Sequence, residues 1–201
     1  MTDVPLAAVD WDGLSAERYE FAFRAVPEGL RGYVWLFPCW IGGRAHVNVG
    51  VYSVDAEGTG PLLHRLLRAE LDRLGVAAGE VKSFPIRWAG RDVHVSAPHV
   101  VLAGDAAGVD ALMGEGISYC FEYARRAAAA ARSALASGRL DFRDYAESVN
   151  DSWFGRKLRR LEQTSRLFYG PSWRLWFGIA GRSRQAQEIG IRWYNGVEDR
   201  K

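Results

Sequence analysis

Apolar and polar residues alternate over much of the first 54 positions, which is the period of a strand with one buried face. The alternation is clear at Tyr19, Phe21 and Phe23, where polar or small residues separate the aromatic ones. Two further strand-like runs, 32–37 and 44–54, follow along the chain. The pattern predicts an antiparallel sheet.

A short link between the second and third runs supports a hairpin. It contains Gly42 and Gly43, a pair that favours a tight turn between neighbouring strands. We expect the strand before the turn to stop at Pro38, because proline has no backbone N–H to donate to a ladder.

Leucine spacing changes the predicted element after residue 60. From Pro61 to Leu74 the leucines recur every three or four positions, and Gly75 follows them, which predicts a helix. Beyond it, residues 81–88 predict another strand. The apolar run 99–103 predicts a short buried strand.

The second half of the chain has helical patterns. A long helix is predicted from about Gly114 to Ala136, closed by Gly138. From residue 141 onward we expect two or three helices, broken at 170–171 and near residue 181. Strands followed by helices predict an α+β fold, with an antiparallel sheet and a helical C-terminal segment.

Composition is typical of a water-soluble globular protein, with 48% hydrophobic and 25% charged residues in 201. No basic start is followed by an apolar run, and no apolar stretch approaches the ~20 residues that span a bilayer. We expect a cytoplasmic protein.

Charge is uneven, since residues 151–201 carry 11 Lys and Arg against 5 Asp and Glu. Two readings of this segment remain open: peripheral contact with a membrane surface, or ordinary helices with a solvated basic face, which we favour. No nucleic-acid motif accompanies the charge. The aromatic and basic residues concerned are Trp173, Trp176, Phe177, Arg156, Lys157, Arg159, Arg160 and Arg174.

Cysteine and histidine usage offers little chemistry. Cys39 and Cys120 are far apart, and the four histidines form no close-spaced pair of ligands. We therefore expect no disulfide framework and no metal site.

The most informative stretch is 100–118, VVLAGDAAGVDALMGEGIS. It predicts an apolar strand that ends at Gly104-Asp105, followed by small residues and then by the helix that Gly114-Glu115-Gly116 opens. The N-terminus of a helix has free N–H groups and a positive dipole end, which favour a negative or electron-rich group. Four glycines and an acid in this order favour ligand binding over a merely tight strand–turn–helix junction.

These features suit a flavin. An aspartate can accept hydrogen bonds from ribityl hydroxyls, and a helix N-terminus would stabilise the charge on a reduced isoalloxazine ring. The stretch closely resembles the second flavin motif of the geranylgeranyl reductase family, in which a G-D-A-A-G turn precedes a D-P-x-T-G-E-G-I helix start. The matching residues are Gly104, Asp105, Ala106, Ala107, Gly108, Asp110, Gly114, Glu115, Gly116 and Ile117.

The resemblance implies that Asp105 binds the ribityl portion of FAD and that the backbone of 114–117 faces the isoalloxazine ring. Ala111 stands where the family has proline and Met113 where it has threonine, so the loop is more apolar here. The implied cofactor contacts are Gly104, Asp105, Ala106, Gly108, Gly114, Glu115, Gly116 and Ile117.

A second motif also resembles that family, whose Y-x-W-x-F-P signature lies on a strand of the substrate sheet. Tyr33, Trp35, Phe37 and Pro38 match it, whereas Leu30 replaces an expected proline. Asn48, Val49, Gly50 and Val51 resemble the N-V-G strand that follows. Alternation puts the aromatic residues on one face, where they would line an apolar slot for a prenyl chain; the alternative is that they are core residues.

The resemblance divides the chain into three segments. Residues 1–97 would form the substrate-facing sheet, 98–140 the flavin-contacting strand, turn and helix, and 141–201 the helical tail. The G-x-G-x-x-G segment that binds the ADP half of FAD in this class has no match in the sequence. We therefore expect a truncated or split flavoprotein, with an N-terminal FAD-binding chain as a candidate partner.

The implied function is FAD-dependent reduction of carbon–carbon double bonds in a prenyl or other hydrophobic substrate. One alternative is a non-catalytic remnant that binds a hydrophobic ligand or a partner subunit. Another, within the same class, is a flavin monooxygenase or halogenase. No residue pattern identifies a catalytic side chain.

Overall fold

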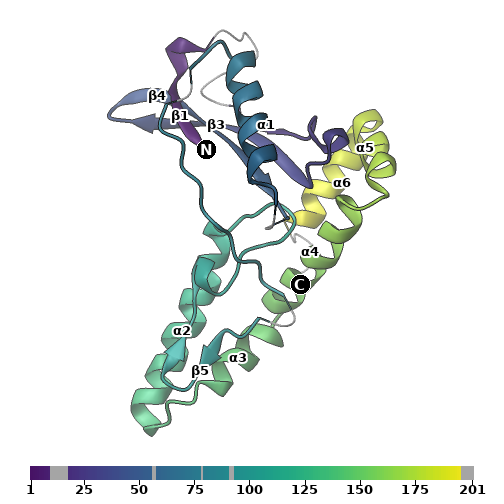
Figure 1. The fold of residues 1–201 in the computed structure, drawn as a ribbon. Coiled ribbons are helices and arrows are strands. Elements are labelled where there is room, and N and C mark those ends of the chain that lie inside the picture. Colours follow the sequence, from purple (N-terminus) through teal and green to yellow (C-terminus); the bar gives the residue numbers. More distant parts are fainter. Residues whose placement is uncertain (10–17, 56–57, 78, 91–92, 196–201) are drawn as a thin grey trace. The chain divides into compact units, whose positions relative to one another are not determined.

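A computed structural model describes residues 1–9, 18–55, 58–77, 79–90 and 93–195 (Figure 1). The chain divides into two compact units, Met1–Pro85 and Ile86–Lys201. Each unit is described by itself. The α+β class is confirmed, because the chain combines antiparallel strands with helices. The three-segment division by function stays a prediction.

The first unit is an antiparallel sheet with one helix, α1 (Gly60–Arg73), along one of its faces (Figure 1). Its four strands have the order β1-β4-β3-β2. The predicted hairpin is confirmed as β3 and β4, and β1 is a strand that the sequence pattern did not predict. The strands are β1 (Thr2–Pro5), β2 (Glu20–Ala22), β3 (Gly32–Ile41) and β4 (Arg44–Ser53).

The prediction that the strand stops at Pro38 is wrong, since β3 continues to Ile41. Pro38 pairs with Val47 of β4, whereas β2 pairs with β3 only as far as Leu36. Beyond Leu36 the strand has one neighbour among the described strands. A proline is tolerated on a strand with a free edge, because no second ladder needs its N–H.

The core of the first unit lies between the sheet and α1. Val34 and Leu36 from β3 pack with Val47 and Val49 from β4 against the leucines of the helix. Glu70 of α1 is buried at 3% exposure. Its carboxylate accepts hydrogen bonds from Arg24 and from Arg73, so the buried charge is paired from two sides.

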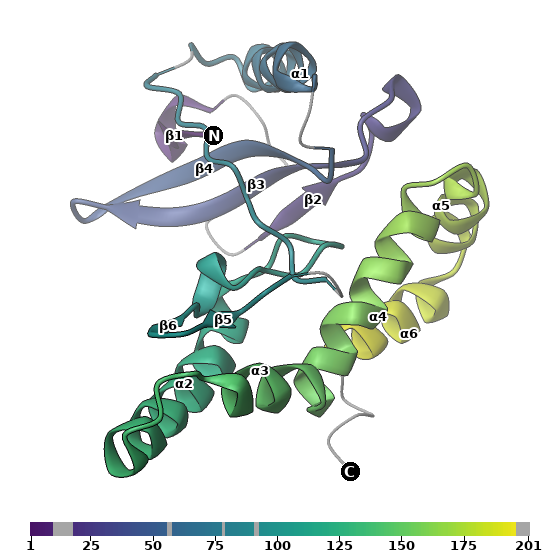
Figure 2. The ribbon, with the colours of Figure 1, turned by 60° about the horizontal axis from the view of Figure 1, so that its bottom comes forward.

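The second unit is mainly helical (Figure 2). The long helix predicted up to Gly138 is confirmed, and Gly138 closes it in a left-handed conformation. Two-stranded pairing of β5 (Ser96–Ala97) with β6 (Val100–Val101) precedes a single 3₁₀ turn, η3 (Gly104–Ala106). The helices are α2 (Ile117–Ser137), α3 (Arg143–Asn150), α4 (Trp153–Phe168), α5 (Trp173–Arg182) and α6 (Arg184–Tyr194).

Two predicted strands of this region are wrong. Residues 81–87 are exposed, and only Trp88 forms a bridge, to Val109. The run 99–103 contributes just β6, and Val100 is 48% exposed. In both cases the apolar residues are present, but within the described residues no wider sheet offers a strand to pair with them.

The tail contains four described helices where two or three were predicted. The break at 170–171 is confirmed, and the one near residue 181 falls at Ser183. An additional break occurs at Ser152, whose hydroxyl caps α4 by accepting from the Gly155 N–H at 3.2 Å. A serine at this position satisfies a donor that the helix leaves unpaired, which favours starting a new helix there.

Several aromatic residues of the tail pack within it. Phe177 lies 5.0 Å from Phe168 and 6.0 Å from Trp173, between ring centroids. The guanidinium of Arg160 lies over Trp193. Peripheral membrane contact stays a prediction. Within the described part of the chain, no helix is both long and apolar enough to cross a bilayer.

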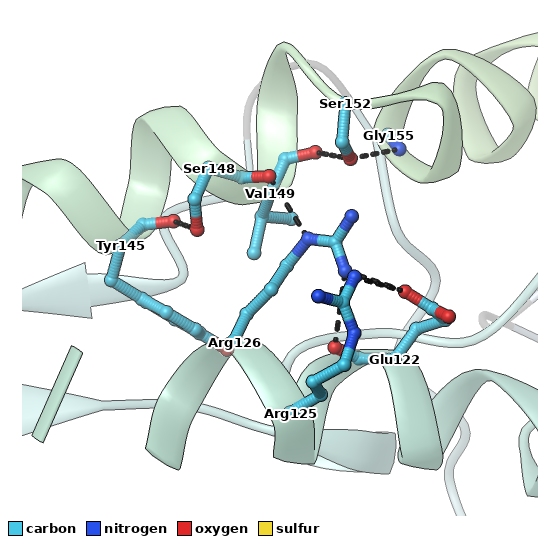
Figure 3. A network of polar contacts seen from close by, with 8 residues as sticks. All are labelled: Glu122, Arg125, Arg126, Tyr145, Ser148, Val149, Ser152 and Gly155. Carbon is cyan, nitrogen blue, oxygen red and sulfur yellow. Dashed lines mark hydrogen bonds and ion pairs between the residues drawn. The ribbon is translucent and has the colours of Figure 1, made fainter. Parts of the chain in front are cut away.

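A polar network centred on Arg126 joins α2 to α3 (Figure 3). The Arg126 side chain is only 9% exposed, and its Nε donates to the Ser148 carbonyl at 3.0 Å. Its Nη1 donates to the Glu122 carboxylate at 2.5 Å. The guanidinium also lies over the Phe154 ring, 5.6 Å from the centroid, so it contacts α4 as well.

Arg126→Ala should lower the free energy of unfolding by about 1–3 kcal/mol, because it leaves the Ser148 carbonyl without this donor and removes one of the two guanidinium groups that pair with Glu122. Arg125 provides a matched control, since it bonds the same Glu122 but is 67% exposed. Arg125→Ala should change stability by no more than about 0.5 kcal/mol. Urea unfolding measures both values, and equal losses would contradict the role of Arg126.

Candidate functional site

The residues predicted from the two motifs form one candidate surface in each unit. The flavin motif lies in the second unit, on η3 and at the start of α2. The aromatic motif lies in the first unit, on β3. The two surfaces are described separately.

The structure brings the two halves of the flavin motif together. The Asp105 carboxylate lies beside the backbone of Gly116, so closely that a Cβ there would be 2.7 Å from Asp105 Oδ1. The same Cβ would be 2.8 Å from Val109. A side chain at Gly116 would force Asp105 or Val109 to move, so the glycine lets an exposed carboxylate lie at the N-terminal end of a 21-residue helix.

Gly108 anchors the turn from behind. Its φ of 112° is rarely adopted by L side chains, and a Cβ there would be 2.4 Å from the backbone nitrogen of Ala89. Next to it, the Ala89 N–H donates to the Val109 carbonyl at 2.8 Å, and the Val109 N–H donates to Arg87 at 2.9 Å. The turn is therefore fixed to the segment 87–89 by backbone hydrogen bonds.

Asp110 organises the loop between the two motif halves. Its side chain is fully buried, at 0% exposure, and both carboxylate oxygens accept hydrogen bonds. Oδ1 accepts from the N–H groups of Leu112 at 2.5 Å and Met113 at 3.1 Å. Oδ2 accepts from the Glu115 N–H at 3.3 Å and from the Tyr194 hydroxyl at 2.6 Å.

These contacts have opposing effects on ionisation. Burial raises the pKa of Asp110, and its four hydrogen-bond donors limit that rise. Burial and the neighbouring Asp110 raise the pKa of Tyr194, so its hydroxyl remains a donor. The ammonium of Lys157 lies 5.8 Å from the Tyr194 ring centroid and 5.2 Å from that of Tyr119.

Glu115 was predicted to contact the cofactor, and here it caps the helix. Its carboxylate accepts from the Ser118 N–H at 2.8 Å and from the Ser118 hydroxyl at 2.6 Å. One of the donors that would otherwise face a ligand is thus already used. The other implied contacts, including exposed Ile117, lie along the same turn and helix start.

This arrangement can bind a group that carries hydroxyls and develops negative charge. Asp105 supplies an acceptor for hydroxyl donors, and the dipole of α2 contributes a positive potential at its N-terminal end. These are the requirements of the ribityl chain and the pyrimidine edge of a flavin. The residues present therefore fit the cofactor that the sequence predicts.

The aromatic motif lies on the sheet face opposite α1. Tyr33, Trp35 and Phe37 alternate with Val34 and Leu36, which belong to the core under the helix. Along β3 the rings of Tyr33 and Trp35 are tilted to each other and those of Trp35 and Phe37 are stacked, with centroid separations of 6.2 and 6.0 Å. Rings from β2, from the residues on either side of β2 and from β4 extend this aromatic face: Tyr19, Phe21, Phe23 and Tyr52.

The prediction that these aromatic residues share a face is confirmed, and within the first unit they are not members of its helix-covered core. Pro38, the fourth residue of the motif, follows Phe37 on β3 and pairs with Val47 of β4. Exposure varies along the aromatic face, from 4% at Tyr52 to 65% at Tyr19. Contact with substrate stays a prediction.

Two residues of β4 hold the Trp35 indole in place. Its Nε1 donates to Asn48 Oδ1 at 2.6 Å, and Asn48 Nδ2 donates to Asp3 at 2.8 Å. The ring lies across Gly50, where a Cβ would be 2.1 Å from an indole carbon. Asn48 and Gly50 belong to the stretch that resembles the N-V-G strand of the family, whereas no sequence pattern predicted the contact with Asp3.

Other candidate groups stay separate. Both cysteines are free thiols and half-buried, and burial raises the pKa of Cys39. Among the residues that the structure describes, no three His, Cys, Asp or Glu side chains come together in a way that could hold a metal ion. The polar contacts of Tyr194 and Tyr169 to the flavin-motif loop had no sequence signal, because they join positions far apart in the chain.

Part of the chain is similar to digeranylgeranylglycerophospholipid reductase 2 of Methanothermobacter thermautotrophicus, with 34% identity over 139 residues. The similarity covers 69% of this chain and 34% of the relative, so the matched part is about a third of the relative's length. No protein-family model matches the chain. No solved structure matches it either.

Gly50→Ala should displace the Trp35 indole and break its hydrogen bond to Asn48, because the added methyl group occupies the space of the ring. The indole N–H resonance of Trp35, assigned with Trp35→Phe, should shift clearly. Asn48→Ala should shift it as well. Gly60→Ala is the control, since its Cβ would meet nothing within 4 Å. An unmoved resonance in Gly50→Ala would refute this packing.

Proposed function

Because this chain belongs to the geranylgeranyl reductase family, we propose that it binds FAD and takes part in reducing carbon–carbon double bonds of a prenyl or other hydrophobic substrate. Members of this family are typically flavoproteins. The cofactor surface would be the turn 104–108 and the helix start 114–117, and the aromatic face of the sheet would contact the substrate.

One observation carries the cofactor proposal: the Asp105 carboxylate lies against Gly116 at the N-terminal end of α2. Two motif halves that are separated by residues 109–113 thus form a single polar surface. Asp105 lies at the surface, so its carboxylate is not needed to stabilise the interior of the strand–turn–helix junction and can accept hydrogen bonds from a ligand. The fit to a sugar-like chain beside an electron-rich ring supports FAD.

Asp105 and the start of α2 would have different roles in binding the cofactor. Asp105 would accept hydrogen bonds from ribityl hydroxyls, and the dipole of α2 would stabilise negative charge at the ring. When bound, the reduced flavin would supply the hydride for the double bond. The chain's own contribution is to orient the cofactor and to hold an apolar substrate.

The aromatic face supports a hydrophobic substrate. A connected surface of rings binds apolar chains through contact area, and Trp35 is fixed by Asn48 and Gly50 rather than free to rotate. A fixed ring loses little side-chain entropy on binding. We propose that the molecule bound there is the prenyl or other hydrophobic substrate.

A partner segment would complete the cofactor surface. Ile117, Phe121 and Leu135 occupy one face of α2 and are 80%, 71% and 84% exposed. This apolar stripe begins at the residue next to Gly116, so a polypeptide covering it would also border the proposed flavin surface. An FAD-binding polypeptide is the occupant proposed here, because the stripe adjoins the proposed flavin surface.

Asp105→Ala should weaken FAD binding about tenfold, because it removes the acceptor for ribityl hydroxyls. Asp141→Ala is the control, since Asp141 accepts from the Arg143 N–H away from the motif and should leave affinity unchanged. Titration of the purified chain, followed by flavin fluorescence and the visible spectrum, measures both. Equal effects, or no saturable binding to the unchanged chain, would refute the cofactor assignment.

Trp35→Ala should weaken the binding of geraniol, a short prenyl alcohol, about tenfold, because it removes the central ring of the aromatic face. Trp40→Ala is the matched control on the same strand, where the side chain is 71% exposed. Isothermal titration calorimetry gives both affinities. If the two variants bind geraniol alike, the aromatic face is not the substrate surface.

A further inference from the structure

Two tyrosine hydroxyls from the tail reach the loop that joins the halves of the flavin motif. The Tyr194 hydroxyl, at the end of α6, donates to Asp110 Oδ2 at 2.6 Å. The Tyr169 hydroxyl, just after α4, donates to the Leu112 carbonyl at 3.0 Å. These contacts span 84 and 57 positions of the sequence.

We propose that Tyr194 and Tyr169 are positioning residues that set the shape of the loop 110–116, so that the C-terminal helices control how this chain contacts its cofactor. The proposal rests on the function proposed above. It assigns the tail a role in the cofactor site, where the sequence predicted a membrane-facing or merely solvated segment.

The loop depends on Asp110 for its shape. The carboxylate binds the N–H groups of Leu112, Met113 and Glu115, which are successive points of the same turn. The Gly114 N–H also donates to the Asp110 carbonyl at 3.0 Å, and the Asp110 N–H donates to Glu115 at 3.2 Å. Any movement of this carboxylate therefore moves the backbone that leads into Gly116 and α2.

Tyr194 donates to this carboxylate from outside the loop. Without it, a side chain at 0% exposure would keep only the donors of its own turn, and a buried carboxylate that loses a partner is strongly destabilised. The turn would then open to let water reach the carboxylate. Tyr169 acts at the other side of the same turn and is itself 3% exposed.

Neither tyrosine needs to touch the cofactor for this effect. Tyr194 acts through Asp110, and the Lys157 ammonium over its ring holds α6 against α4. The Asp105 carboxylate lies beside Gly116, and Gly116 follows Glu115, whose N–H donates to Asp110, so the influence passes through the backbone.

The first test needs no ligand. Hydrogen exchange of the peptide that covers 110–118 should be about tenfold faster in Tyr194→Phe than in the unchanged protein, because one hydrogen bond to a buried charge is lost. Tyr145→Phe is the matched control. It removes a buried hydroxyl that donates to the Leu102 carbonyl at 2.5 Å, and it should leave the exchange of 110–118 unchanged.

A double-substitution cycle separates positioning from general loss of stability. Asp110→Asn should speed exchange of the loop as well, and adding Tyr194→Phe to it should have little further effect, because both act through one hydrogen bond. If Tyr194→Phe accelerates exchange over the whole second unit, or not at all in 110–118, the positioning role is wrong.

The second test uses FAD with the same variants. Tyr194→Phe should weaken FAD binding about tenfold and alter the visible spectrum of the bound flavin, whereas Tyr145→Phe should preserve both. If the loop exchange responds but the unchanged protein binds no FAD, the function proposed above fails and the loop clamp stands. If FAD binds equally well to both variants, the tail does not control the cofactor contact.

Discussion

The buried carboxylate of Asp110 is the constraint on which the second unit's candidate site depends. A charge with no exposure is stable only if it is surrounded by donors, and here three come from the loop itself and one from the last described helix. Satisfying this one group folds the loop into a turn. The turn then presents Gly116 and the start of α2 beside Asp105.

In the first unit, the two faces of the sheet differ in what covers them. Val34 and Leu36 belong to the core under α1, whereas Tyr33 and Trp35, which alternate with them, lie on the other face of the sheet. A single helix covers only one face, and on the other face Trp35 and Phe37 remain partly exposed. Asn48 then fixes the central ring through a hydrogen bond that a purely apolar core would not require.

Much of this could be predicted from the sequence, because it depends on local patterns. The hairpin from 32 to 53, the helix after Pro61 and the long helix closed by Gly138 follow from periodicity and turn residues. The motif residues at 104–117 were grouped by order along the chain, and the structure brings Asp105 and Gly116 together.

What could not be predicted depends on partners distant in the sequence. An apolar run such as 99–103 becomes a buried strand only if neighbouring strands exist, and just Val100–Val101 finds one. Pro38 remains in its strand because β2 begins only at Glu20, opposite Leu36. The tyrosine contacts to the loop join positions 57 and 84 residues apart, and no local pattern encodes such a pairing.

The apolar stripe on α2 has a practical consequence for handling the protein. Ile117, Phe121 and Leu135 are exposed along one face of the helix, and exposed apolar side chains favour self-association as concentration rises. Yield and dispersity of the isolated chain should therefore be limited by this face rather than by folding stability. Co-production with a polypeptide that covers the stripe is the rational route to concentrated material.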